Sequence, residues 1–100
     1  VVPGPNTLGA LTVVSVAGAT SGQTMIYVNP SKGAGNSYKY KTSASVALPS
    51  AGDILTTGWT AWDGSAAITA TTGNQIVIVE VVTATNAAVN AGIATVTAKA

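Results

Sequence analysis

Short runs of β-branched and aromatic residues recur along this sequence, separated by glycine, proline or asparagine at intervals of about 8 to 12 residues. No long apolar period of about 3.6 residues, the signature of an amphipathic helix, lies between them. The Ala- and Asn-rich stretch 84–92 offers only Val89 as a sizeable apolar residue, so at most one short helical turn is expected there. The pattern predicts strands at residues 11–16, 23–29, 37–42, 43–48, 54–62, 66–70, 75–82 and 93–98. We also expect Asp63-Gly64 to turn the fifth of these strands into the sixth as a hairpin.

The run 75–82 is the strongest strand in the sequence. One face would carry Ile76, Ile78 and Glu80, and the other Val77, Val79 and Val81. Because both faces are apolar, we expect this strand to lie at the centre of its sheet. Glu80 needs a partner such as Lys39, Lys41 or a backbone donor if it points inward, and needs none if it faces water near the strand end.

These elements predict an all-β fold, an immunoglobulin-like antiparallel β-sandwich of about seven strands. At 100 residues the chain has the size of one domain with one core, and without cysteine its stability must come from packing and backbone hydrogen bonds. We assign residues 11–100 to the sandwich. Residues 1–10, rich in proline and glycine, are interpreted as an N-terminal arm or linker. That arm could be disordered, or it could lie on a neighbouring subunit through Val1 and Val2.

Charge is scarce: 7% of the residues are charged and the formal net charge is +1, against about 25% charged residues in an ordinary soluble domain. Four lysines and no arginine give no basic stripe for a phosphate backbone, so we expect no nucleic-acid partner. No apolar run is long enough to cross a bilayer, so we expect no membrane partner. A weakly charged surface favours either a subunit of an assembly, including a homo-oligomer, or an extracellular β-domain.

The residue types needed for catalysis are almost absent. The chain has no histidine and no cysteine, which removes the usual general base, the commonest metal ligand and the triads that depend on them. Its three carboxylates, Asp53, Asp63 and Glu80, do not form the spaced series of a calcium loop. We therefore predict that the protein is not an enzyme and has no catalytic, metal-binding or cofactor-binding residues and no cofactor.

Aromatic side chains are the feature that could carry binding, because exposed rings stack on sugars or anchor protein interfaces. The candidates are Tyr38, Tyr40, Trp59 and Trp62, from an aromatic set that also includes Tyr27. Trp59 and Trp62 are three residues apart and would face opposite sides of a regular strand. One could therefore be core and the other surface.

Six segments carry a family resemblance: SGQTMIYVNP, GNSYKYKT, GWTAWDG, ITATTGN, IVIVEV and AGIATVTAKA. Together they resemble a small immunoglobulin-like domain of tailed-bacteriophage structural proteins, over residues 17–100. The resemblance implies a virion protein that decorates or cements the capsid surface, or a head-fibre protein, with a major capsid or other virion protein as its partner. Residues 82–86 are neutral, where such domains often carry charge, which puts any charge-mediated contact of that loop in doubt.

A different class of function is left open beside this one. A carbohydrate-binding or adhesive surface module would use the exposed aromatics on a glycan. The expected location is the capsid surface of a virion, or otherwise extracellular.

Overall fold

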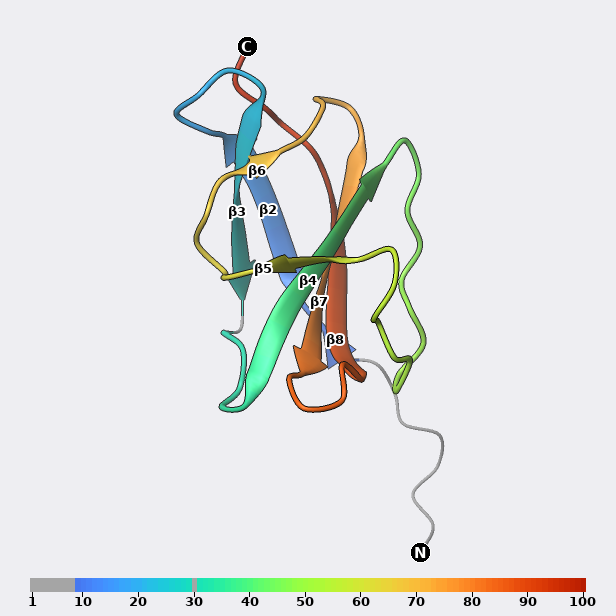
Figure 1. The fold of residues 1–100 in the computed structure, drawn as a ribbon. Coiled ribbons are helices and arrows are strands. Elements are labelled where there is room, and N and C mark those ends of the chain that lie inside the picture. The colour runs from blue at the N-terminus through green and yellow to red at the C-terminus, as the bar shows by residue number, and fades with distance from the viewer. Residues whose placement is uncertain (1–8, 30) are drawn as a thin grey trace, which may run out of the picture.

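The computed structural model describes residues 9–29 and 31–100 of the chain, and Figure 1 shows them as two facing β-sheets. The strands are β1 (Gly9–Ala10), β2 (Thr12–Ala17), β3 (Gln23–Asn29), β4 (Asn36–Ser43), β5 (Thr60–Trp62), β6 (Ile68–Thr69), β7 (Gln75–Val82) and β8 (Ala88–Thr95). One sheet has the order β1-β8-β7-β4-β5 and the other the order β2-β3-β6. Within these residues there is no helix. The predicted all-β sandwich is confirmed, although one of its strand pairs, β1 with β8, is parallel.

Strand β7 lies at the centre of the five-stranded sheet, as its sequence predicts. Ile76 and Ile78 point between the sheets and join the main core. Val77, Val79 and Val81 point the other way and form a second core with Leu55, Ala88 and Ala91, against which Val46 and Trp59 pack. The connection 44–59 therefore covers the outer face of this sheet. Six consecutive β7 side chains, from Ile76 to Val81, are buried as a result.

The main core fills the space between the two sheets and draws on almost every strand. Its buried members are Leu11, Ile26, Tyr38, Trp62, Ile68, Ile76, Ile78 and Val96. Ile26 points inward, as expected, and Val28 packs against the same cluster. With no phenylalanine in the chain, Tyr38 and Trp62 supply the large rings that such a core requires.

The chain changes sheets near both of its described ends. After β1, Leu11 donates its backbone N–H to the Ala91 carbonyl, and the chain then enters β2 in the other sheet. This crossing lies directly on Gly92, where a Cβ would collide with the Leu11 carbonyl oxygen and lie 2.8 Å from Val13 Cγ2. Gly92 is thus needed for a close backbone approach.

The second crossing follows β8. Val96 is buried in the main core, and Lys99 then pairs with the opposite sheet by donating its N–H to the Gln23 carbonyl. The Thr97 N–H donates to Ser15 Oγ, which hydrogen-bonds the buried Thr24 hydroxyl at 2.6 Å. In Figure 1 the described chain enters at one end of the sandwich and leaves at the other.

Several expected elements differ from the structure. Of the expected strand 43–48 only Ser43 is in a strand, at the end of β4, and the expected strand 54–62 is reduced to Thr60–Trp62, because residues 44–59 form the covering connection. The expected hairpin around Asp63-Gly64 is wrong: β5 pairs with β4 and β6 pairs with β3, so the chain changes sheets at this turn. The last strand begins at Ala88 rather than Ile93, because Ala88, Ala91 and Gly92 are small enough to lie beneath the connection 44–59 and the Leu11 crossing.

The predicted boundary between arm and domain stays a prediction. Residues 1–8, including the candidate interaction residues Val1 and Val2, lie outside the described part of the chain. Gly9 and Ala10, which were assigned to the arm, form strand β1 on the edge of the five-stranded sheet.

Replacement of Gly92 by alanine tests the crossing. The added methyl group must displace the Leu11 backbone, so we expect G92A to lower the free energy of unfolding by about 1–3 kcal/mol in urea titrations. G33A is the matched control, because a Cβ at Gly33 has its nearest neighbour at 3.4 Å. Equal stability of the two variants would contradict the close approach.

Candidate functional site

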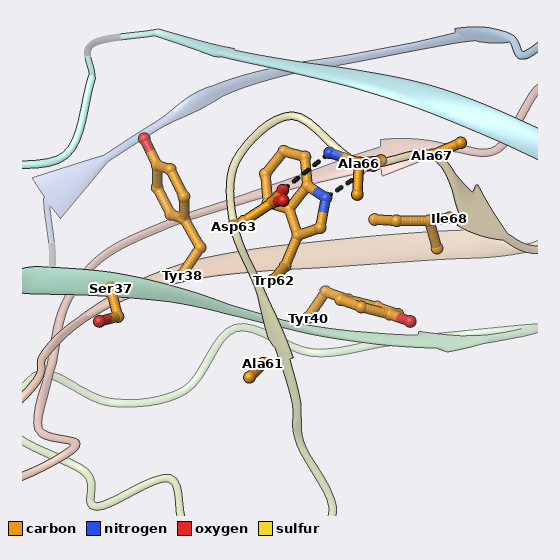
Figure 2. A pocket seen from close by; sticks show the side chains of 9 residues that line it. All are labelled: Ser37, Tyr38, Tyr40, Ala61, Trp62, Asp63, Ala66, Ala67 and Ile68. Atoms are coloured by element: carbon orange, nitrogen blue, oxygen red, sulfur yellow. Dashed lines mark hydrogen bonds between the residues drawn. The ribbon is translucent and has the colours of Figure 1, made fainter.

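A hollow of about 530 Å³ lies where the edges of the two sheets separate, beside the edge strand β5 (Figure 2). Strand β4 supplies one wall, and the turn from β5 to β6 supplies the other. The lining residues are Ser37, Tyr38, Tyr40, Ala61, Trp62, Asp63, Ala66, Ala67 and Ile68. Three of the four aromatic candidates, Tyr38, Tyr40 and Trp62, are thus brought together here.

Trp62 is fixed by its neighbours. Its ring centroid lies 5.4 Å from that of Tyr38, with the planes tilted by 41°. Its indole Nε1–H donates to the Ala66 carbonyl at 2.8 Å, as Figure 2 shows. Tyr38 and Trp62 are both buried and Tyr40 is half-buried. The hollow is therefore lined by rings that belong to the core or pack against it, rather than by a free aromatic platform.

Asp63 shapes the turn that carries this wall. Its Oδ1 accepts hydrogen bonds from the backbone N–H groups of Ser65, at 2.8 Å, and Ala66, at 2.7 Å. These two donors lower the pKa of Asp63 below its ordinary value, because they favour the charged form. Gly64 follows with a φ of 92° and packs against the Tyr38 ring. The Asp63 carboxylate therefore serves to hold the backbone of its own turn.

Trp59 lies on the opposite face of the sheet. It is half-buried on the second core, and Lys41 Nζ lies 4.7 Å from its ring centroid, within cation–π range. The expectation that the two tryptophans face opposite sides is therefore confirmed. Tyr27, on the outer face of the other sheet, is the most exposed aromatic residue of the described chain, at 59%. The interaction roles of Tyr38, Tyr40, Trp59 and Trp62 stay predictions.

The one buried charged group of the described chain is Glu80, opposite a β-bulge at Val89 of β8. Its Oε2 accepts hydrogen bonds from the Gly33 N–H at 2.8 Å and from Asn36 Nδ2 at 2.7 Å. Its Oε1 accepts one from Asn90 Nδ2 at 2.9 Å. Gly9 packs so closely on Asn90 that any Cβ would collide with the amide. Glu80 therefore joins β4, β7, β8 and the loop before β4 at one end of the sandwich, beside β1.

The pKa of Glu80 lies below its ordinary value, as the net result of two opposing effects. Burial alone would raise the pKa, but the hydrogen bonds from Asn36, Gly33 and Asn90 favour the carboxylate and outweigh it, helped by the charge of Lys32. Burial raises the pKa of the neighbouring Tyr38, and Glu80 adds to that shift. The expected backbone donor to Glu80 is confirmed, whereas Lys39 and Lys41 lie elsewhere, on the face that carries Val79 and Val77.

The described residues offer little reactive chemistry. They contain no group of three or more potential metal ligands of the His, Cys, Asp or Glu type. The Ser37 hydroxyl, at the rim of the hollow, is hydrogen-bonded to the Thr83 hydroxyl. No helix in the described ranges is long and apolar enough to span a bilayer. The fold is that of a β-sandwich module.

The family follows from sequence comparison. Residues 16–98 match the model of the S-layer protein SbsC C-terminal domain, which is most of the chain, and the protein belongs to this family. A search of curated proteins found no match.

Two solved structures share the fold. The structure of surface layer protein SbsC, domains 4–9, superposes with a TM-score of 0.70 at 21% identity, over 94% of this chain and 15% of that chain. The crystal structure of the S-layer protein SbsC, domains 7, 8 and 9, gives a TM-score of 0.70 at 23% identity, over 93% of this chain and 28% of that one. This chain thus spans a small part of each of the longer proteins.

The family corrects the expectations drawn from resemblance. The chain is not identified with a phage capsid-decoration domain, and the virion location and the capsid partner are wrong. The family match gives no support to the carbohydrate-binding alternative. The coarser extracellular location agrees with a surface-layer family. The error arose because Thr- and Gly-rich strand segments reflect the sandwich architecture that unrelated surface proteins share.

Replacement of Glu80 by glutamine tests the buried carboxylate. The glutamine amide would face the amide donors of Asn36 and Asn90, so we expect E80Q to lower the free energy of unfolding at neutral pH by about 1–3 kcal/mol. The folded-state pKa of Glu80 lies below that of the unfolded chain, about 4.3. The advantage of the wild type should therefore be complete above that pH and shrink as pH falls through the folded-state pKa. Urea titrations of both proteins across the acid range measure it, and a constant difference would contradict the assignment.

A second variant tests the buried indole. We expect W62F to lower the free energy of unfolding by about 1–3 kcal/mol, because it leaves the Ala66 carbonyl without its donor and removes ring volume. W59F is the matched control, since Trp59 is only half-buried. Equal losses in thermal or urea unfolding would show that Trp62 has no special place in the core.

Proposed function

We propose that this protein is a non-enzymatic structural domain of an extracellular surface-layer protein, and that it contributes to a self-assembled lattice on the cell surface. The observation that carries the proposal is membership of the SbsC C-terminal domain family over residues 16–98. The fold agrees, since both similar structures are stretches of several domains of a surface layer protein. The low charge and the scarcity of reactive side chains agree with a mechanical rather than a chemical role.

The course of the chain suits one link in a series of domains. Strand β1 lies beside Glu80 and its hydrogen-bond partners Gly33, Asn36 and Asn90 at one end of the sandwich. Ala100 lies at the opposite end (Figure 1). A domain of this kind transmits tension along its length when the chain continues at both ends.

The entering and leaving strands are suited to resist such tension. Gly9 and Ala10 of β1 pair in parallel with Asn90 and Ala91 of β8, and the Leu11 N–H bonds the Ala91 carbonyl. Pulling the two ends apart loads these parallel hydrogen bonds together in shear instead of opening them one by one. Glu80, through Asn90, ties the same part of β8 to β7 and to the loop before β4.

Immunogold labelling tests the location and the lattice role. Antibodies raised against the purified chain should label the outer surface of intact cells that carry its gene, with regular spacing in negatively stained envelope fragments. Antibody pre-absorbed with the chain is the control. Label confined to the cell interior would overturn the proposal.

A further inference from the structure

The two sheets of the sandwich have outer faces that differ sharply in cover. The outer face of the five-stranded sheet is packed beneath Leu55, Val46 and Trp59. On the outer face of the three-stranded sheet, Val14 is 47% exposed and Tyr27 is 59% exposed. The protein thus covers one apolar sheet face with its own connection and presents the other to the surroundings.

The exposed face is organised like an interface. Cross-strand pairing places Val14 beside Tyr27, and Val16 beside Met25, at its centre. We name these four residues the β2–β3 strip. Uncharged polar side chains surround the strip on the same face: Thr12, Gln23, Asn29 and Thr69. An apolar centre within a polar rim, with charge excluded, is the usual anatomy of a protein contact.

The distribution of charge favours a like partner. Strands β2, β3 and β6 contain no charged residue. Lys39 and Lys41 pair with Val79 and Val77 and share the opposite outer face with them. The exposed Lys99, whose backbone N–H donates to the Gln23 carbonyl, is the one charged residue that these pairings place beside the three strands. Two copies placed strip to strip would therefore meet with little like-charge repulsion, whereas a strongly charged partner would find few complementary charges there.

We infer that the β2–β3 strip is a self-association surface on which a second copy of this chain packs sheet to sheet. The inference rests on the proposed lattice function and gives it a specific contact. Two strands of about 20 Å and the two-residue β6, in rows about 4.8 Å apart, offer a footprint of roughly 220 Å² per copy. A stable isolated dimer needs about 800 Å² per partner, so this contact is weak alone and holds through repetition in an array.

Sedimentation velocity and NMR titration of the 100-residue chain, from micromolar to millimolar concentration, test the surface. We expect weak, concentration-dependent association with chemical-shift changes centred on the strip. The variant V14K should weaken this association at least about tenfold while leaving the melting temperature unchanged, because it buries an unpaired charge at the contact. L48K is the matched control: Leu48 is 52% exposed and lies in the connection that covers the other sheet. Y27T, which adds no charge, is a second variant in case V14K does not fold, and it should weaken association as well.

Each outcome decides the inference. Loss of association in V14K and Y27T but not in L48K supports it. A wild-type chain that stays monomeric overturns the inference, and so do equal effects of V14K and L48K on association. It is also overturned if the NMR chemical shifts of the strip change only when a separate peptide of residues 1–8 is added. Regular surface labelling combined with a monomeric chain would leave the proposed function standing while removing this contact. Association of the chain without surface labelling would support this contact while removing the proposed function.

Discussion

Burial of strand β7 on both faces is the constraint around which the rest of the sandwich is arranged. A strand with apolar residues on both faces must be covered twice, and each buried valine or isoleucine contributes about 1.5–3 kcal/mol when it is removed from water. The second sheet supplies one cover and the connection 44–59 supplies the other. The small residues of β8 follow from the same need, because Ala88 and Ala91 leave room for Leu55 above the sheet.

A charge in the middle of such a strand is tolerable only if the surroundings are built for it. Glu80 is satisfied by two amide side chains and one backbone N–H instead of a cation, so its neighbours must be held at fixed distances. These hydrogen bonds hold β4, β7, β8 and the loop before β4 together at the end of the sandwich where the described chain enters. Glycine is needed at position 9 because any Cβ there would displace the Asn90 amide from Glu80.

The sequence predicted those parts of the fold that depend on local pattern. The run 75–82 identified a central strand, because a period of two places apolar residues on both of its faces. The spacing of turn residues identified a sandwich, because it sets the number and length of the strands. It could not predict which sheet each short strand joins. Thr60–Trp62 and Ile68–Thr69 are too short for their own composition to decide between a hairpin and a change of sheet, and that choice is made by the core positions of Trp62 and Ile68.

For the candidate site, as for the fold, the sequence indicated which residues matter but not which of them come together. A need for polar partners at Glu80 follows from its apolar strand, but Asn36 and Asn90 become its donors only through the β4–β7 and β7–β8 registers. The aromatic residues could be nominated but not placed, because in a chain without phenylalanine the same rings must also fill the core. Composition favoured either a subunit of an assembly or an extracellular β-domain and could not indicate which kind, since a low-charge sandwich suits a capsid surface and a cell-surface layer equally. What separates the two is the family match, while the physical requirement they share, an uncharged face that tolerates close neighbours, is met by the outer side of β2 and β3.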